Sequence, residues 1–198
     1  MRLLDDEIYY LNRALDGEKI FGVNPKLKTL MLDDKEVEKN LKDKALLDEN
    51  NKINKAACKI IRRIEQYKNC DRHIIIDDNI IIAPYEGKKI IVLKKEDEQT
   101  FHLDKTLLEF VVVNIISKHN FLLGEIEEDN DDCDIPTIIN DYEDKISIEE
   151  VNSNFENKKI IFYYKNKKVY KYNVLNENIE KMNGVKARKE IVSLLEHK

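Results

Sequence analysis

The sequence predicts an α+β fold in which a winged-helix-like lobe continues into an antiparallel sheet packed on a central helix. Helical amphipathic patterns fill the first part of the chain, and short Ile-rich runs separated by turn residues follow them. Low counts of Gly (5) and Pro (3) disfavour a turn-rich β-sandwich. We expect a winged-helix-like lobe (1–70), a sheet with the central helix (71–124) and a smaller α/β half (125–198). At 198 residues, these segments fit one compact domain or two packed units.

The first helix is expected over about residues 6–16, because Asp5 can cap its start and Gly17 offers a left-handed stop. Its apolar stripe consists of Leu4, Ile8, Leu11 and Leu15. A turn at Phe21-Gly22 follows this helix.

Two further helices complete the expected lobe. The second starts near Asp33 or Asp34 and ends before Leu47, and Asn54 caps the third over about residues 55–67. One face of the third helix is apolar and contains Ala56, Ala57, Ile60, Ile61, Ile64 and Tyr67. The opposite face is basic and contains Lys55, Lys59, Arg62 and Arg63.

Short strands are expected next. They are His73–Asp77, Ile80–Tyr85, Lys89–Lys94 and Thr100–Leu103. The runs Ile74–Ile76 and Ile80–Ile82 do not alternate with polar residues, so we expect both faces of the sheet to be covered. Asp104 can cap a helix reaching about His119, whose apolar residues point nearly all round, and we expect this helix to be central and buried.

The second half begins with an acidic stretch, Glu125–Asp134, that is expected to be an exposed linker. The segment Ser147–Glu150 has the residue pattern of a capping box and predicts a short helix. The runs Ile160–Tyr164 and Val169–Val174 predict a hairpin. A last helix is expected over about residues 186–196, after the break at Asn183-Gly184.

Composition and charge exclude several classes of protein. The net charge of -5 disfavours a general nucleic-acid binder, although a local basic patch remains compatible with it. The cysteines are Cys58, Cys70 and Cys133, an odd number without CxxC spacing, which favours a reducing compartment and not a metal site. We see neither a signal peptide nor a membrane span, and we expect a cytoplasmic protein.

No motif for catalysis, a metal or a cofactor stands out. The acidic stretch lacks the Gly and Glu that an EF-hand requires, and the four His residues are scattered without ligand spacing. Cys70 and His73 lie close in sequence, but no third group is placed to orient them. We therefore expect a protein that is not an enzyme and uses no cofactor, with a small enzyme of unrecognised type as the remaining alternative.

Two surfaces are candidates for binding. The hairpin carries the aromatic residues Tyr163, Tyr164, Tyr170 and Tyr172, which form either core or a partner-binding surface. The basic face of the third helix, with Lys55, Lys59, Arg62 and Arg63, is either a solvated outer face or a contact with nucleic acid.

The opening of the chain resembles a known family. The likeness is carried by Glu7–Leu11, Leu15–Gly17, Ile20–Gly22, Leu41–Leu47, Lys52-Ile53 with the helix to Tyr67, and the step from Asp71 to His73 into the Ile-rich strands. They resemble the EspG-like family, the cytosolic accessory proteins of ESX (type VII) secretion systems, including their Gram-positive relatives. The resemblance covers roughly residues 4–123, and the second half is similar only in the order of its elements.

This resemblance implies a cytosolic chaperone or adaptor without enzymatic activity. Its partner would be an α-helical secretion substrate of the WXG or LXG type, which exposes an apolar seam between two helices. The resemblance identifies no contact residues. The alternative is a winged-helix transcriptional regulator that binds DNA through the basic face of the third helix.

Overall fold

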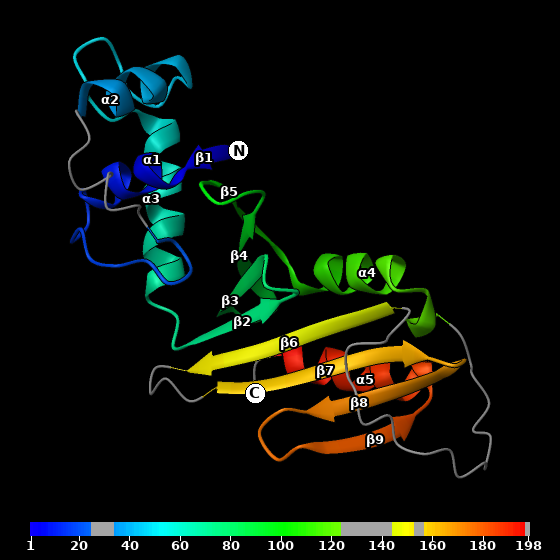
Figure 1. The fold of residues 1–198 in the computed structure, drawn as a ribbon. Helices are drawn as coiled ribbons and strands as arrows, with labels where there is room; N and C mark the ends of the chain where they lie inside the picture. The colour runs from blue at the N-terminus through cyan, green and yellow to red at the C-terminus, as the bar shows by residue number, and fades with distance from the viewer. Residues whose placement is uncertain (25–33, 124–143, 153–156, 197–198) are drawn as a thin grey trace.

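The computed structural model describes residues 1–24, 34–123, 144–152 and 157–196. In this part of the chain, nine strands form one antiparallel sheet in the order β1-β5-β4-β3-β2-β6-β7-β8-β9. Helices lie on both faces of the sheet (Figure 1). The expected α+β class is confirmed.

The strands are β1 (Arg2–Leu4), β2 (Arg72–Ile76), β3 (Ile80–Glu86), β4 (Lys89–Lys95), β5 (Thr100–Leu107), β6 (Asp144–Asn152), β7 (Asn157–Lys165), β8 (Lys168–Asn173) and β9 (Asn178–Met182). The helices are α1 (Asp5–Asn12), α2 (Asp34–Asp43), α3 (Lys55–Lys68), α4 (Leu108–Lys118) and α5 (Gly184–Leu195), with a 3-10 helix, η2 (Asn120–Leu122).

The first hydrophobic core lies between α1–α3 and strands β1 and β3–β5. Helix α3 contributes Ala57, Ile60, Ile64 and Tyr67, all buried. Its start is fixed by Asn54, whose side chain accepts hydrogen bonds from the backbone N–H groups of Ala56 (2.8 Å) and Ala57 (3.1 Å). The expected cap and the expected apolar face are confirmed, except that Ala56 is exposed.

The second core lies on the other face of the sheet, under α4, η2 and α5. Ile146, Ile148, Ile160 and Phe162 point into it from β6 and β7. Helix α5 closes this core with Ala187, Ile191 and Leu195. In Figure 1, α5 lies behind strands β6–β8.

The expected cover on both faces of the Ile-rich strands is only partly present, because Ile74, Ile76 and Ile82 are buried in the second core whereas Ile75 and Ile81, on the other face, are half-buried. On β3, Ile82 packs in the second core, whereas the next residue, Ala83, packs in the first. On β4, Ile90 and Ile91 divide between the two cores in the same way. Because neighbouring residues on a strand point to opposite faces, this arrangement requires apolar runs.

The N-terminal lobe differs from a winged helix. Its three helices and the β2–β3 hairpin follow in the expected order, but β1 precedes α1 and pairs with β5. On its other edge, β2 pairs with β6 from residue 144 onward. The lobe therefore lies on one half of a large sheet and does not form a separate winged unit. Pairing of β2 with β6 also carries the sheet across the expected boundary at residues 124 and 125, and the division into three domains stays a prediction.

Two helix predictions are wrong. Asp104 is not a cap, because β5 continues along β4 as far as Leu107 and α4 starts only at Leu108. The segment Ser147–Glu150 lies inside β6, where pairing with β2 and β7 outweighs the local capping signal.

Helix α4 is not centrally buried either. Leu108, Val111 and Ile115 are buried, whereas Phe110 and Val113 are each 62% exposed. The helix covers the sheet with one face and turns an apolar face to solvent.

The first helix and the aromatic hairpin are present, but their boundaries differ from the predicted ones. Helix α1 ends at Asn12, before the expected residue 16, and its N-cap is Leu4, not Asp5. The hairpin is β7–β8, whose turn residues Asn166 and Lys167 both have positive φ angles. Strands β1 and β9 were not expected. The acidic stretch 125–134 lies outside the described residues.

Candidate functional site

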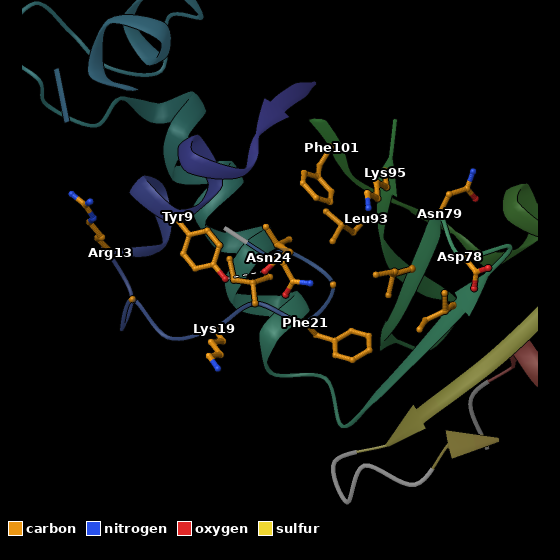
Figure 2. Close-up of a pocket in the computed structure, with 16 residues that line it drawn as sticks. Tyr9, Arg13, Lys19, Phe21, Asn24, Asp78, Asn79, Leu93, Lys95 and Phe101 are labelled. Atoms are coloured by element: carbon orange, nitrogen blue, oxygen red, sulfur yellow. Dashed lines mark hydrogen bonds between the residues drawn. The ribbon is translucent and has the colours of Figure 1, made fainter. Parts of the chain in front are cut away.

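A cleft of about 1020 Å³ lies between the α1 side of the lobe and strands β2–β5. Figure 2 shows Tyr9, Lys19 and Phe21 on the helical side and Leu93 and Lys95 on the strand side. The described residues that line it are mainly aliphatic and aromatic, with a few charged side chains.

The floor of the cleft is a row of aligned side chains on three strands. Ile75 of β2 pairs with Ile81 of β3, and Ile81 pairs with Leu93 of β4, so all three point to the same face. Phe101 of β5 pairs with Lys95 of β4 and extends this face toward the edge of the sheet. The floor therefore combines an apolar row with one lysine.

The opposite wall is the loop of residues 17–24, which is tied down by side-chain hydrogen bonds. The hydroxyl of Tyr9 donates to the carbonyl of Val23 (3.0 Å), and the hydroxyl of Tyr67 donates to the carbonyl of Phe21 (2.9 Å). The side-chain amide of Asn12 donates to the carbonyl of Glu18 (2.7 Å). This wall is anchored to α1 and α3.

His73 contributes to the same anchoring. Its ring contacts the rings of both Phe21 and Tyr67, with centroids 4.7 Å apart in each pair. Its Nε2 lies 3.2 Å from the carbonyl oxygen of Tyr67, and burial lowers the pKa of His73. A neutral imidazole that donates to this carbonyl joins the loop, α3 and β2.

Three cationic residues, Arg13, Lys19 and Lys95, line the cleft. The guanidinium of Arg13 is neutralised by Asp34, with Nη1 2.8 Å and 2.9 Å from its two carboxylate oxygens. Lys19 and Lys95 are exposed and have no ion-pair partner among the described residues. Asp78, an acidic residue of the lining, lies 3.7 Å from Nζ of Lys159. The cleft is therefore locally positive in a chain of net charge -5.

A second titratable cluster lies at the end of α4. Nδ1 of buried His119 is 2.8 Å from Oδ1 of Asp144, and its Nε2 is 3.7 Å from Oδ2 of Asp77. Lys118 is also 3.2 Å from that Asp77 oxygen, and the backbone N–H of Ser147 donates to the other. Asp77 raises the pKa of His119, burial opposes the rise, and Asp144 adds to it. This cluster fixes the end of α4 to the β2–β3 turn and to β6.

The four tyrosines proposed for partner binding lie apart from the cleft. Tyr163 and Tyr170 are buried and stack on each other, with ring centroids 5.2 Å apart. Tyr164 and Tyr172 are half-buried, and the ring of Tyr164 stacks on Phe121. Their role in partner binding stays a prediction, and two of the four are part of the packed interior.

The basic face of α3 is only partly available. Lys55, Lys59 and Arg62 are exposed. Arg63 is half-buried, where it donates to the carbonyl of Leu103 (3.2 Å) and lies 3.5 Å from Asp104. Three of the four residues therefore form a solvated basic row, and the fourth fastens α3 to β5.

Cys70 and His73 do not form a pair. The thiol of Cys70 contacts the carbonyl of Pro84 (2.9 Å), and burial raises its pKa. Among the described residues, no group of three or more His, Cys, Asp or Glu side chains is arranged to hold a metal ion. No helix in the same part of the chain has the length and apolar character needed to cross a bilayer.

The sequence interpretation missed the cleft. Its floor comes from four strands and its wall from a loop, and these residues share no periodicity. The available signal was the Phe21-Gly22 turn, because a glycine in an apolar loop indicates close approach of another element.

Comparison with known protein families places the whole chain in one of them. A sequence model matches residues 4–196, from the end of β1 through α5. The chain belongs to the family described as a domain of unknown function (DUF5081). No curated protein matches the sequence of this DUF5081 chain.

Proposed function

We propose that this DUF5081 chain is a cytoplasmic chaperone or adaptor that binds a helical-hairpin substrate of a type VII secretion system. The observation that carries the proposal is the cleft, with its apolar floor and its loop wall tied to α1 and α3. The resemblance of residues 4–123 to the EspG-like family supports the same function.

The chemistry of the cleft suits a helical partner. A secreted helical hairpin exposes an apolar seam that must be shielded from water before export. Pockets for small molecules typically hold about 300–1,000 Å³, so this cleft is at or above the upper end of that range. Side chains from one face of a helix would fill it, and a preformed floor avoids the entropic cost of ordering a loop on binding.

Co-expression tests this function. The chain is produced together with each WXG-type or LXG-type protein encoded near its gene, and complexes are isolated through a tag on the chain and analysed by size-exclusion chromatography. A stable complex with at least one of these proteins is the expected result. Failure of every such protein to bind would overturn the proposal.

The basic row of α3 favours a second candidate function, binding of DNA. Lys55, Lys59 and Arg62 are exposed along one side of the helix. A DNA-binding protein would show affinity that falls steeply with salt, because phosphate contacts release counterions. If the protein has no salt-sensitive affinity for duplex DNA at low ionic strength, this candidate is excluded. If it binds, Lys59→Glu together with Arg62→Glu should abolish the binding.

A further inference from the structure

We infer that the cleft binds an amphipathic helix whose apolar stripe is flanked by acidic residues. This inference rests on the proposed function and adds the chemistry of the partner segment. Its basis is the placement of two unpaired lysines around an apolar floor, as the described residues show it.

The two lysines stand on different sides of the cleft. Lys19 comes from the loop wall, and Lys95 comes from β4, across the apolar floor (Figure 2). Lys95 shares a sheet face with Phe101, its partner across the strands, so its side chain starts from the floor and not from the outer surface. Leu93 and Phe101 are each only 2% exposed and already belong to the first core, so the apolar surface open to a ligand is that of the half-buried Ile75 and Ile81. A helix entering the cleft over these two residues would meet Lys19 on the loop wall and Lys95 on β4.

The charges of the residues that line the cleft indicate that the partner segment is negatively charged. Arg13 and Asp78 already have partners in Asp34 and Lys159, so Lys19 and Lys95 carry the charges left to meet a ligand. Acidic side chains on the partner would form charge-assisted hydrogen bonds with them, and basic ones would be repelled. The charge of this cleft is opposite to the net charge of the chain, so the cleft would also steer an acidic segment toward itself.

The shape of the floor favours a helix over a lipid anion. Ile75 and Ile81 pair across β2 and β3 and are both half-buried, so they offer a short apolar step for a ridge of side chains, whereas Leu93 beyond them is buried in the first core. A fatty acid has one carboxylate and would use one of the two lysines. Two cations on different sides match a segment with acidic residues on both flanks.

Two designed peptides test the inference with the full-length chain. Each has about 18 residues, a length of five helical turns, with a fluorescent label and Leu at i, i+3, i+4 and i+7 spacing. One has Glu on both flanks of the Leu stripe and the other has Lys. We expect the Glu peptide to bind and the Lys peptide to bind at least about tenfold more weakly, as measured by fluorescence anisotropy. The double variant Lys19→Glu, Lys95→Glu should reverse that order.

A matched control separates the local effect from net charge. Lys55→Glu with Lys59→Glu changes the chain by the same total charge but alters exposed positions in the first turns of α3, away from the cleft. This control should leave affinity for the Glu peptide within about twofold, since surface charges beyond a Debye length are screened. Circular dichroism confirms that both double variants are folded.

Several outcomes would overturn the inference. They are equal affinity of the two peptides, an equal loss in the control variant, no binding of either peptide, or binding of oleate without binding of peptide. The proposed function is judged separately. A hairpin protein that still binds the Lys19→Glu, Lys95→Glu variant would leave the chaperone function standing and remove the cleft as its site. If the Glu peptide binds in the cleft but no hairpin protein forms a complex, the inference about the cleft stands and the chaperone function is overturned.

Discussion

A Cβ atom on Gly22 would collide with Cδ1 of Ile81, so the loop wall of the cleft touches its floor at a glycine. Gly22 also has a φ angle of +76°, a conformation that side chains other than glycine adopt at a cost. The φ angle therefore favours glycine at this position, and a methyl group there would in addition force the flexible end of the Ile81 side chain to move.

Gly22→Ala should destabilise the chain by about 1–3 kcal/mol, because it strains the backbone and displaces the end of the Ile81 side chain. Gly17→Ala is the matched control, since Gly17 has a φ angle of +68° but a methyl group there would meet nothing within 4 Å among the described residues. Urea denaturation of both variants measures the difference. If Gly22→Ala costs no more than Gly17→Ala, contact with Ile81 does not hold the loop in place.

The His119 cluster should make stability depend on pH. The pKa of His119 is raised in the folded state by Asp77 and Asp144 against the opposing effect of burial. The stabilisation is therefore complete below the unfolded pKa and is lost as pH rises through the folded pKa. We expect the free energy of unfolding of the wild type relative to His119→Gln to fall as pH rises from about 6.5, the ordinary pKa of histidine, through the raised folded pKa.

His73 contributes with the opposite sign and must be separated from this effect. Burial lowers its folded pKa, so its contribution is present above the unfolded pKa and is lost as pH falls through the folded pKa. Comparing the wild type with His119→Gln at each pH cancels this contribution, because both proteins retain His73. A difference that stays constant across the titration would show that His119 does not exchange its proton on unfolding.

Tyr163→Phe should stabilise the protein by about 1 kcal/mol. The side chain is buried, and its hydroxyl has no hydrogen-bond partner among the described residues, so the hydroxyl is desolvated without compensation. Burial, together with Tyr170, raises the pKa of Tyr163 to about 12. The control is Tyr67→Phe, which removes the hydrogen bond to Phe21 and should destabilise by about 1–2 kcal/mol. Thermal denaturation distinguishes the two; a destabilised Tyr163→Phe protein would show that this hydroxyl has a partner.

The two faces of α4 should respond differently to substitution. Phe110→Gln changes a side chain that is 62% exposed and should alter stability by no more than about 0.5 kcal/mol. Ile115→Ala removes a buried side chain of the second core and should cost about 2–5 kcal/mol. Chemical denaturation of both variants tests this assignment, which would be wrong if their costs were similar.

Helix starts were predictable where the signal is local. Asn54 caps α3 as expected, through a side-chain oxygen within three residues of the groups it satisfies. Asn183 was expected only as part of a break before residue 186, but it caps α5 in the same way, and the helix starts at Gly184. Asp104 and Ser147 carry similar local signals, but cross-strand pairing places them in β5 and β6. Such pairing depends on residues far along the chain, which periodicity does not detect.

The cleft was unpredictable for the same reason. Lys19 follows a helix and Lys95 ends a strand, and they line one cleft only because the loop of residues 17–24 packs beside the strands. The basic row on α3 was visible because one helix presents all of it. Sequence patterns within one element therefore revealed a surface, whereas a site assembled from several elements required the fold.

Pairing of β2 with β6 determines how the protein responds to truncation. Removing everything after Leu123 would leave the isoleucines of β2 at an open sheet margin, with unpaired amide and carbonyl groups. A margin of this kind is a template for self-association, so such a fragment should aggregate. The lobe should therefore be studied within the full-length chain, in which β6 keeps β2 paired.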